Sequence, residues 1–293
     1  MKKILIFGCI ASLFLLASCD KVNNPYKPQS TKTITGNNAV RKVLVEDYTG
    51  HLCGNCPTAG AESETLRQLY GNQVVCMELN VSASFAGPCP SPNPLPTGAP
   101  TGAYSVDYRS AVGTTYDNFF GISNNGLPQG MIDRFTVSGS KGLPTTAWAT
   151  VVDSLTKAPI LANITVTNTY NTSTRMLNTS LSSQFVSALS GTNTYKLVVL
   201  LVQDSIFDWQ EDYATNPSDI PNYSKRFTLR DVINNAWGDT LATGNVSAGT
   251  TVVKSYTNYH INPAWNAATC HVISFIYETS DNFVLQAEDD RVE

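Results

Sequence analysis

The pattern of apolar and polar positions divides the chain after its N-terminal leader into two regions. In the first, residues 40–158, short β-branched runs alternate with amphipathic segments. The pattern predicts strands at residues 40–48, 73–81 and 131–134, and helices at residues 58–70, 104–122 and 145–157. This alternating order is typical of an α/β domain in which helices pack on a sheet.

The second region, residues 159–293, is dominated by short strands separated by polar turns. Strands are predicted at residues 160–170, 177–186, 195–203, 250–261, 269–278 and 283–288. Only residues 229–236 show a helical pattern. Such a run of strands favours an all-β antiparallel sandwich, with the boundary between the two domains near Pro159.

Before these regions, the chain begins with two lysines and an apolar run of 14 residues over residues 4–17. This run is too short to span a bilayer and is typical of a signal peptide. Residues 16–19 read Leu-Ala-Ser-Cys, which resembles a bacterial lipobox. The resemblance implies cleavage after residue 18 and lipid attachment at Cys19, and an ordinary secretory signal is the alternative.

If Cys19 is lipidated, residues 1–18 are the lipoprotein signal peptide and residues 19–39 are a flexible tether rich in Asn, Lys, Pro, Ser and Thr. Because several acyl chains give a stable anchor, we expect attachment to the membrane through this residue. After the leader, no apolar run approaches the roughly 20 residues of a membrane span.

Composition and charge exclude some classes of function. Hydrophobic residues make up 42% of the 293 residues, so a sizeable core is expected, whereas charged residues make up only 14%. The formal net charge is −4, and no basic block occurs in the chain. Nucleic-acid binding through a patch that neutralises phosphates is therefore not expected.

The sharpest chemical signal is Cys53-Gly54-Asn55-Cys56, which lies between a predicted strand and a predicted helix. Unpaired N–H groups and the helix dipole at a helix N-terminus stabilise a thiolate, and two intervening residues let the cysteines close a small disulfide ring. Zinc sites also use this spacing but need a second ligand pair, and His260 and His271 are not at ligand spacing.

Three neighbouring residues favour redox chemistry. Asp47 lies six residues before Cys53 on the predicted strand, where a half-buried carboxylate could take a proton from Cys56. His51, if protonated, would favour the Cys53 thiolate. Pro128 precedes a short strand, where thioredoxin-like domains place a cis-proline loop facing the cysteines. The alternatives are an exposed acid at a strand end, a solvated histidine and an ordinary trans proline.

The remaining cysteines suggest a structural role. Cys76 and Cys89 are 13 residues apart, and a disulfide between them would staple the loop rich in Pro and Gly over residues 86–101. With Cys9 in the leader and Cys19 expected to carry lipid, five cysteines remain, namely these two and Cys53, Cys56 and Cys270. Five is an odd number, so at least one thiol stays free or pairs outside the chain. We expect this to be Cys270, buried as a small apolar side chain.

Four segments carry a resemblance to a known family. Residues 43–57 read Val-Leu-Val-Glu-Asp-Tyr-Thr-Gly-His-Leu-Cys-Gly-Asn-Cys-Pro, and residues 126–134 read Gly-Leu-Pro-Gln-Gly-Met-Ile-Asp-Arg. With residues 229–232 and 284–288, they resemble the Omp28-related outer membrane lipoproteins of Bacteroidetes-type bacteria. The resemblance covers nearly all of the chain after the leader. It implies an outer membrane location, an α/β thioredoxin-like domain over residues 40–158 and an all-β antiparallel sandwich over residues 159–293.

The chain departs from thioredoxins at two positions. Leu52 replaces the Trp usually found before the first cysteine, and Asn55 replaces the Pro common between the two cysteines. The loss of the Trp puts the docking of substrates in doubt, but the two thiols that the chemistry needs are present.

Two functions compete on this evidence. In the first, Cys53 is the nucleophile, Cys56 the resolving thiol and Asp47 a proton carrier, and the protein exchanges disulfides with exported proteins without a cofactor. In the second, the disulfide is only a staple, and the lipoprotein binds a partner protein or a glycan. They differ in whether Cys53 is exposed at the helix start or capped by the loop over residues 86–101.

Overall fold

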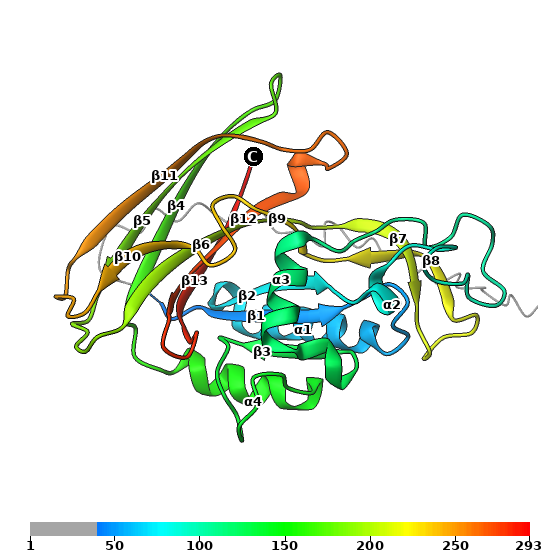
Figure 1. Cartoon of the computed structure of the whole chain (residues 1–293), viewed down its shortest axis with the longest axis horizontal. Coiled ribbons are helices and arrows are strands. Elements are labelled where there is room, and N and C mark those ends of the chain that lie inside the picture. The colour runs from blue at the N-terminus through cyan, green and yellow to red at the C-terminus, as the bar shows by residue number, and fades with distance from the viewer. Residues whose placement is uncertain (1–39) are drawn as a thin grey trace, which may run out of the picture. The chain divides into compact units, whose positions relative to one another are not determined.

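The computed structural model describes residues 40–293 (Figure 1). The predicted signal peptide, the tether and Cys19 lie outside the described residues. The central feature is an eight-stranded sheet with the strand order β13-β12-β6-β9-β2-β1-β3, in which β10 also pairs with β6. Its strands are β1 (Val43–Thr49), β2 (Val74–Asn80), β3 (Gln129–Ile132), β6 (Thr194–Gln203), β9 (Thr228–Val232), β10 (Asp239–Thr243), β12 (Cys270–Glu278) and β13 (Val284–Arg291).

Two smaller sheets complete the strand content, and Figure 1 shows them at opposite ends of the large sheet. One is three-stranded, in the order β11-β5-β4, and the other is the hairpin of β7 and β8. Their bounds are β4 (Ala162–Asn171), β5 (Met176–Phe185), β11 (Thr251–His260), β7 (Ile206–Glu211) and β8 (Asp219–Lys225).

The four α-helices of residues 40–293 all lie before Pro159. They are α1 (Cys56–Tyr70), α2 (Ala83–Ala86), α3 (Ala111–Phe120) and α4 (Thr145–Thr156), and short 3₁₀ turns cover Gly71–Gln73, Ile122–Asn125 and Ala267–Thr269. As expected for a helix C-cap, Gly71 has a positive φ of 58° after α1. The helix predicted at residues 104–122 begins only at α3, because the Ser110 side chain caps it by accepting from the Gly113 N–H at 3.0 Å.

Side chains alternate between the two faces of the large sheet and build three apolar cores. One face carries a single core that runs from β1 and β2 to β6 and β12 and is covered by α3. On the opposite face, α1 and α4 cover β1–β3. Farther along this face, the three-stranded sheet packs on β6, β12 and β13 in a sandwich-like arrangement. The architecture is thus mixed α/β with mainly antiparallel pairing.

The large sheet passes through the predicted domain boundary. β1, β2 and β3 come from residues 40–158, whereas β6, β9, β12 and β13 come from residues 159–293. Residues on both sides of Pro159 belong to one compact unit. The prediction of two separate domains is corrected accordingly, because parallel pairing of β9 with β2 joins the two parts.

The helix predicted at residues 229–236 was also wrong. Leu229 and Val232 lie in β9, which pairs with β6 through backbone hydrogen bonds. The helical spacing of apolar residues in this segment arises because the strand is short and runs into an irregular turn. The hairpin of β7 and β8, over residues 206–225, had not been predicted.

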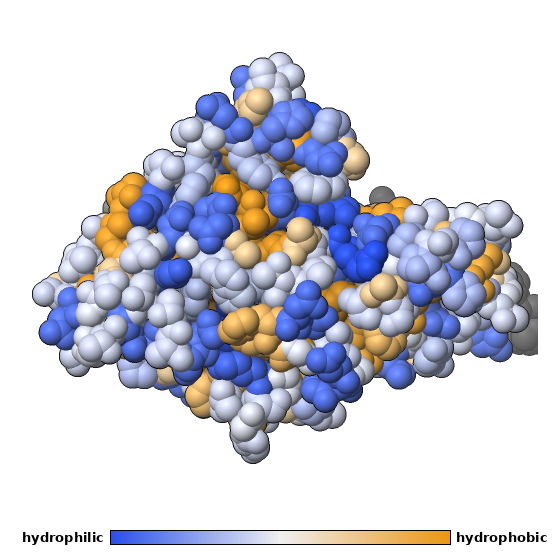
Figure 2. Space-filling model, viewed as in Figure 1, coloured by the Kyte–Doolittle hydropathy of each residue, from blue (hydrophilic) through white to orange (hydrophobic). Residues whose placement is uncertain are grey.

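Within residues 40–293, no helix is long and apolar enough to cross a membrane. On the face shown in Figure 2, apolar surface occurs as separate patches between hydrophilic side chains. Scattered apolar residues of this kind are ordinary for a protein surface.

A buried ion pair lies under α3 in the core that both parts of the chain share. Arg134 donates two hydrogen bonds of 2.9 Å to Glu46, and both side chains are fully buried. The guanidinium also lies over the rings of Tyr116 and Phe275, at 4.6 and 4.8 Å from the centroids. The pair thus links β1, the end of β3, α3 and β12.

We expect Glu46→Leu to lower the free energy of unfolding by about 3–5 kcal/mol, because it leaves the Arg134 charge buried without a partner. Urea unfolding would measure this loss, and Glu46→Leu/Arg134→Met should recover most of it. As a control, Asp153→Asn breaks the exposed pair with Lys157 and should leave the midpoint unchanged. If the double variant lost as much free energy of unfolding as Glu46→Leu alone, the cost would not come from an unpaired Arg134 charge.

Candidate functional site

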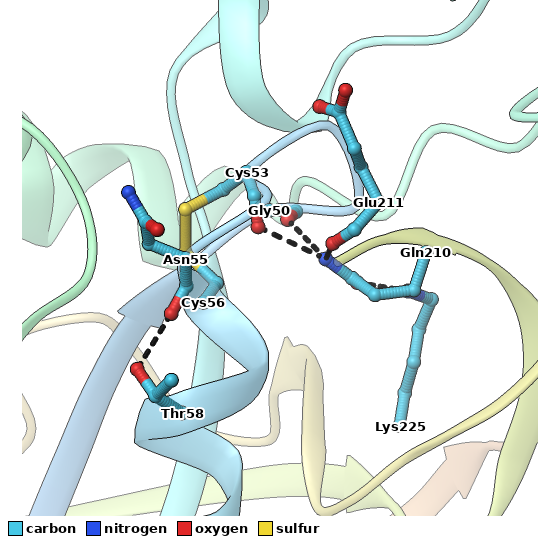
Figure 3. Close-up of a disulfide and its surroundings, with 8 residues drawn as sticks. All are labelled: Gly50, Cys53, Asn55, Cys56, Thr58, Gln210, Glu211 and Lys225. Atoms are coloured by element: carbon cyan, nitrogen blue, oxygen red, sulfur yellow. Dashed lines mark hydrogen bonds between the residues drawn. A yellow bond between two sulfur atoms is a disulfide. The ribbon is translucent and has the colours of Figure 1, made fainter. Parts of the chain in front are cut away.

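Cys53 and Cys56 form a disulfide in the turn between β1 and α1, with 5.3 Å between their Cα atoms (Figure 3). The turn is held by the Cys53 N–H on the Gly50 carbonyl and the Cys56 N–H on the Cys53 carbonyl, at 3.1 and 3.0 Å. Because α1 begins at Cys56, Cys53 lies just before the helix N-terminus. Pro57 falls in the first turn, where a missing N–H is tolerated. Each cysteine is only 3% exposed.

The hairpin of β7 and β8 covers this turn. The Gln210 side chain donates to the carbonyls of Gly50 and Cys53, at 3.1 and 3.3 Å (Figure 3). The backbone N–H groups of Glu211 and Tyr213 add two further bonds to the turn. The sequence predicted either an exposed Cys53 or a Cys53 capped by residues 86–101. The structure shows neither, because the hairpin from the second part of the chain caps it.

Two glycines make this close packing possible. A Cβ on Gly54 would lie 2.4 Å from the Tyr213 ring, and one on Gly50 would lie 2.4 Å from the Phe85 carbonyl oxygen. Real Cβ atoms are not found so close to other heavy atoms. Glycine at these positions lets the hairpin on one side and α2 on the other approach the backbone of the cysteine turn.

Behind the disulfide lies a polar cavity of about 10 Å³, about the volume that one water molecule needs. Asp47 and Cys56 both line it, as do Glu78 from β2 and Lys225 from β8. Asp47 is only 1% exposed, so it is not an exposed acid at a strand end. Its Oδ1 atom has no hydrogen-bond partner among residues 40–293.

Burial controls the charge states in this cavity. Burial, and then repulsion from Glu78, raises the pKa of Asp47 well above its usual value. Burial also raises the pKa of Glu78 and lowers that of Lys225, while their mutual attraction acts against both shifts. Lys225 is fixed by donating a 2.9 Å hydrogen bond to Gln210. The raised pKa means that burial favours the protonated form of Asp47, beside Cys56 in the same cavity.

His51 does not supply a positive charge to Cys53. It is fully buried, and its Nε2 atom lies 2.9 Å from the Gly87 carbonyl oxygen. Its ring packs edge-on against Tyr104 and Tyr108. Burial lowers the pKa of His51 to about 4, so the imidazole is neutral at physiological pH, and a solvated loop histidine is also excluded.

The Leu127–Pro128 peptide bond is cis, immediately before β3. Gln129 pairs with Tyr48 at the end of β1, so the register places Pro128 beside the start of the cysteine turn. That the proline faces the two sulfurs, as in thioredoxin-like domains, stays a prediction.

The predicted disulfide between Cys76 and Cys89 does not form. Both are buried free thiols, and each contacts a different carbonyl: Cys76 that of Ser63, and Cys89 that of Pro94. Cys76 belongs to β2 and packs under α1, whereas Cys89 lies in a small cluster with Tyr104. Cys270 is likewise a buried free thiol, as predicted.

No group of three or more His, Cys, Asp or Glu side chains in the described part of the chain is placed to hold a metal ion. The sequence did not predict which hairpin residues lie beside the cysteines, namely Gln210, Tyr213 and Lys225. Alternating strand patterns at residues 206–211 and 219–225 around a polar turn could have revealed the hairpin. No local signal connects it to the cysteines.

We expect the stability of the protein to depend on His51 at acidic pH. Its folded pKa of about 4 lies below the ordinary 6.5, so between these values the unfolded chain binds a proton that the native state does not. Native stability therefore falls as the pH is lowered from 6.5 to 4. His51→Gln should reduce this loss by up to about 3 kcal/mol, measured by urea unfolding across this range.

The control is His260→Gln, at an exposed position, which should leave the pH dependence as in the wild type. If the stability of His51→Gln ran parallel to that of the wild type over the whole range, the buried neutral state of His51 would be contradicted.

The model of the family described as Outer membrane protein Omp28 matches residues 114–293. The match begins after the cysteine turn. No curated protein matches the chain.

Two solved structures are similar to the chain. A structural-genomics protein from Agrobacterium tumefaciens is 15% identical, with a TM-score of 0.47, and the match covers 88% of this chain and 97% of that one. A domain of the outer membrane lipoprotein Omp28 from Porphyromonas gingivalis is 14% identical, with a TM-score of 0.30, covering 47% of this chain and 93% of the domain. Because the family match spans more than half of the sequence, the chain belongs to the Omp28 family of outer membrane proteins.

Proposed function

We propose that this Omp28-family protein is a lipid-anchored module for thiol–disulfide exchange with exported proteins. Cys53 is the sulfur that partners attack, Cys56 is the resolving thiol, and Asp47 carries the proton. The observation that carries this proposal is the cavity that Asp47 shares with Cys56, because a buried carboxyl group with a raised pKa is of use beside a cysteine that leaves as a thiolate.

The arrangement of strands around the cysteines supports a thioredoxin-like first part. β1 and β2 are parallel and joined through α1, and β3 pairs antiparallel with the other edge of β1. The cysteines lie between β1 and α1, and a cis-proline precedes β3. In this fold the position of the pair before a helix N-terminus favours the Cys53 thiolate of the reduced protein.

The exchange step balances without a cofactor. A partner thiolate attacks the Cys53 sulfur, a bond between the partner and Cys53 forms, and the Cys53–Cys56 bond breaks. Cys56 leaves as a thiolate and takes the proton of Asp47. A second partner thiol then attacks the partner's own sulfur, so that Cys53 leaves as a thiolate, the partner is oxidised and the cysteine pair is reduced. The reverse sequence reduces a partner disulfide.

A second candidate is a binding lipoprotein in which the disulfide is a staple. The low exposure of both cysteines under the hairpin favours it. So does a cleft of about 480 Å³ between the loop before α3 and the hairpin, lined by Trp209, Pro100, Asn216 and Asp219 among others. An aromatic ring beside amide and carboxyl groups suits a neutral polar ligand such as a glycan.

A trapping experiment distinguishes the two candidate functions. If the protein exchanges disulfides, Cys56→Ser leaves Cys53 without its resolving thiol. Mixed disulfides with envelope proteins should then accumulate and be cleaved on reduction. Non-reducing electrophoresis of the membrane fraction after acid quenching would detect them. Cys53→Ser/Cys56→Ser is the matched control and should trap none.

The reduction potential of the purified protein decides the same question independently. A working pair should equilibrate with glutathione, whereas a potential far below about −300 mV, with no mixed disulfide in the trap, would contradict exchange and favour the staple.

We propose further that the protein is attached to the outer membrane through lipid on Cys19. Family membership supports an outer membrane association, and the lipobox-like residues 16–19 support the anchor. Cys19→Ala should release the protein from sedimented membranes, because the apolar leader alone does not span a bilayer. Lys21→Ala, two residues away, should not. Continued sedimentation of Cys19→Ala after a carbonate wash would contradict the anchor.

A further inference from the structure

The hairpin occupies almost every carbonyl of the cysteine turn. The carbonyl oxygens of residues 50, 51, 53 and 54 all accept hydrogen bonds from residues 210–213. Gln210 provides two of these bonds through its side chain. The other two are backbone bonds, from Glu211 to His51 at 2.9 Å and from Tyr213 to Gly54 at 2.8 Å.

The two backbone bonds have the spacing of a strand. Glu211 and Tyr213 are two residues apart, and in an extended chain the N–H groups of alternate residues point in the same direction. The backbone carbonyls of His51 and Gly54 are therefore placed to accept hydrogen bonds from two alternate N–H groups along one edge of an extended segment. Binding of this kind, in which a peptide adds to a backbone edge through main-chain hydrogen bonds, depends little on side-chain sequence.

The part of the hairpin that lies on the turn is open to exchange with another chain. Tyr213 is 63% exposed although its ring lies against Gly54, and residues 213–217 are exposed. The rest of the hairpin is anchored independently, since Tyr108 donates to Asp208 at 2.5 Å and Tyr104 donates to Asp219 at 2.7 Å. Displacing residues 211–213 from the turn therefore leaves these anchors intact.

We propose that residues 211–213 occupy the docking edge for an extended, cysteine-containing polypeptide segment. Such a segment displaces them, gives two N–H groups to the carbonyls of His51 and Gly54, and brings its own sulfur to Cys53. This inference rests on the proposed exchange function and specifies its partner class, namely unfolded or extended protein segments rather than small thiols.

The test uses the reduced full chain carrying Cys56→Ser and two synthetic peptides of twelve residues. Each has one central cysteine, carried as a mixed disulfide with thionitrobenzoate. In the second peptide, the two flanking N–H groups on the docking edge are methylated. Attack by the Cys53 thiolate joins the peptide to Cys53 and releases coloured thionitrobenzoate, which is followed by absorbance. The small disulfide of free cysteine with thionitrobenzoate reports the intrinsic reactivity of Cys53.

We expect the unmodified peptide to react about tenfold faster than the methylated one, as the loss of two hydrogen bonds predicts. Tyr213→Ala should speed the reaction of the unmodified peptide severalfold. Phe207→Ala removes an aromatic ring of similar exposure, 65%, from the same hairpin and should not.

Equal rates for the two peptides, or equal effects of Tyr213→Ala and Phe207→Ala, would overturn the docking edge. Failure of the proposed function has a different signature, in which no reagent, including the small disulfide, reacts faster than with the Cys53→Ser/Cys56→Ser background.

Discussion

The pairing of β9 with β2 is the constraint on which the site depends. The two strands meet at one register pair, Glu78 with Thr228, and the Glu78 N–H donates to the Phe227 carbonyl at 3.0 Å. Since β8 ends only two residues before Phe227, this contact leaves the hairpin little freedom in where it lies. It brings Lys225 to the cavity behind Cys56 and the hairpin strand to the cysteine turn. A sheet continuous across both parts of the chain thus completes a site that the first part begins.

The cysteine pair combines two properties. The cysteine pair lies before a helix N-terminus with a buried acid behind it, which is the arrangement that supports the proposed exchange. The same pair is covered by polar contacts from a segment about 160 residues later in the chain, which shields it from solvent. Under the proposed exchange function, a partner reaches the sulfurs only after it displaces this cover, so partners would be selected before any sulfur is attacked.

Two neighbouring buried acids on β1 have different surroundings. Glu46 and Asp47 are neighbours on β1 and point to opposite faces of the sheet, as alternation requires. Glu46 is satisfied by Arg134 in the core under α3, whereas Asp47 has an oxygen without a hydrogen-bond partner among residues 40–293. One carboxylate thus stabilises the packing of both parts of the chain. The other is a buried carboxyl group whose pKa is raised, in the cavity that Cys56 also lines.

The sequence by itself determined the local elements: the strand before Cys53, the helix after it, the end of that helix at residue 70, and most strands after residue 159. These follow from the periodicity and capping preferences of neighbouring residues. Only the tertiary structure decided that the two parts share a sheet, that Cys76 and Cys89 stay apart, that His51 is buried and neutral, and that Gln210 and Lys225 meet the cysteine pair. Those outcomes depend on contacts between residues far apart in the chain, and no local pattern of side chains encodes which distant strand edge will be chosen as partner.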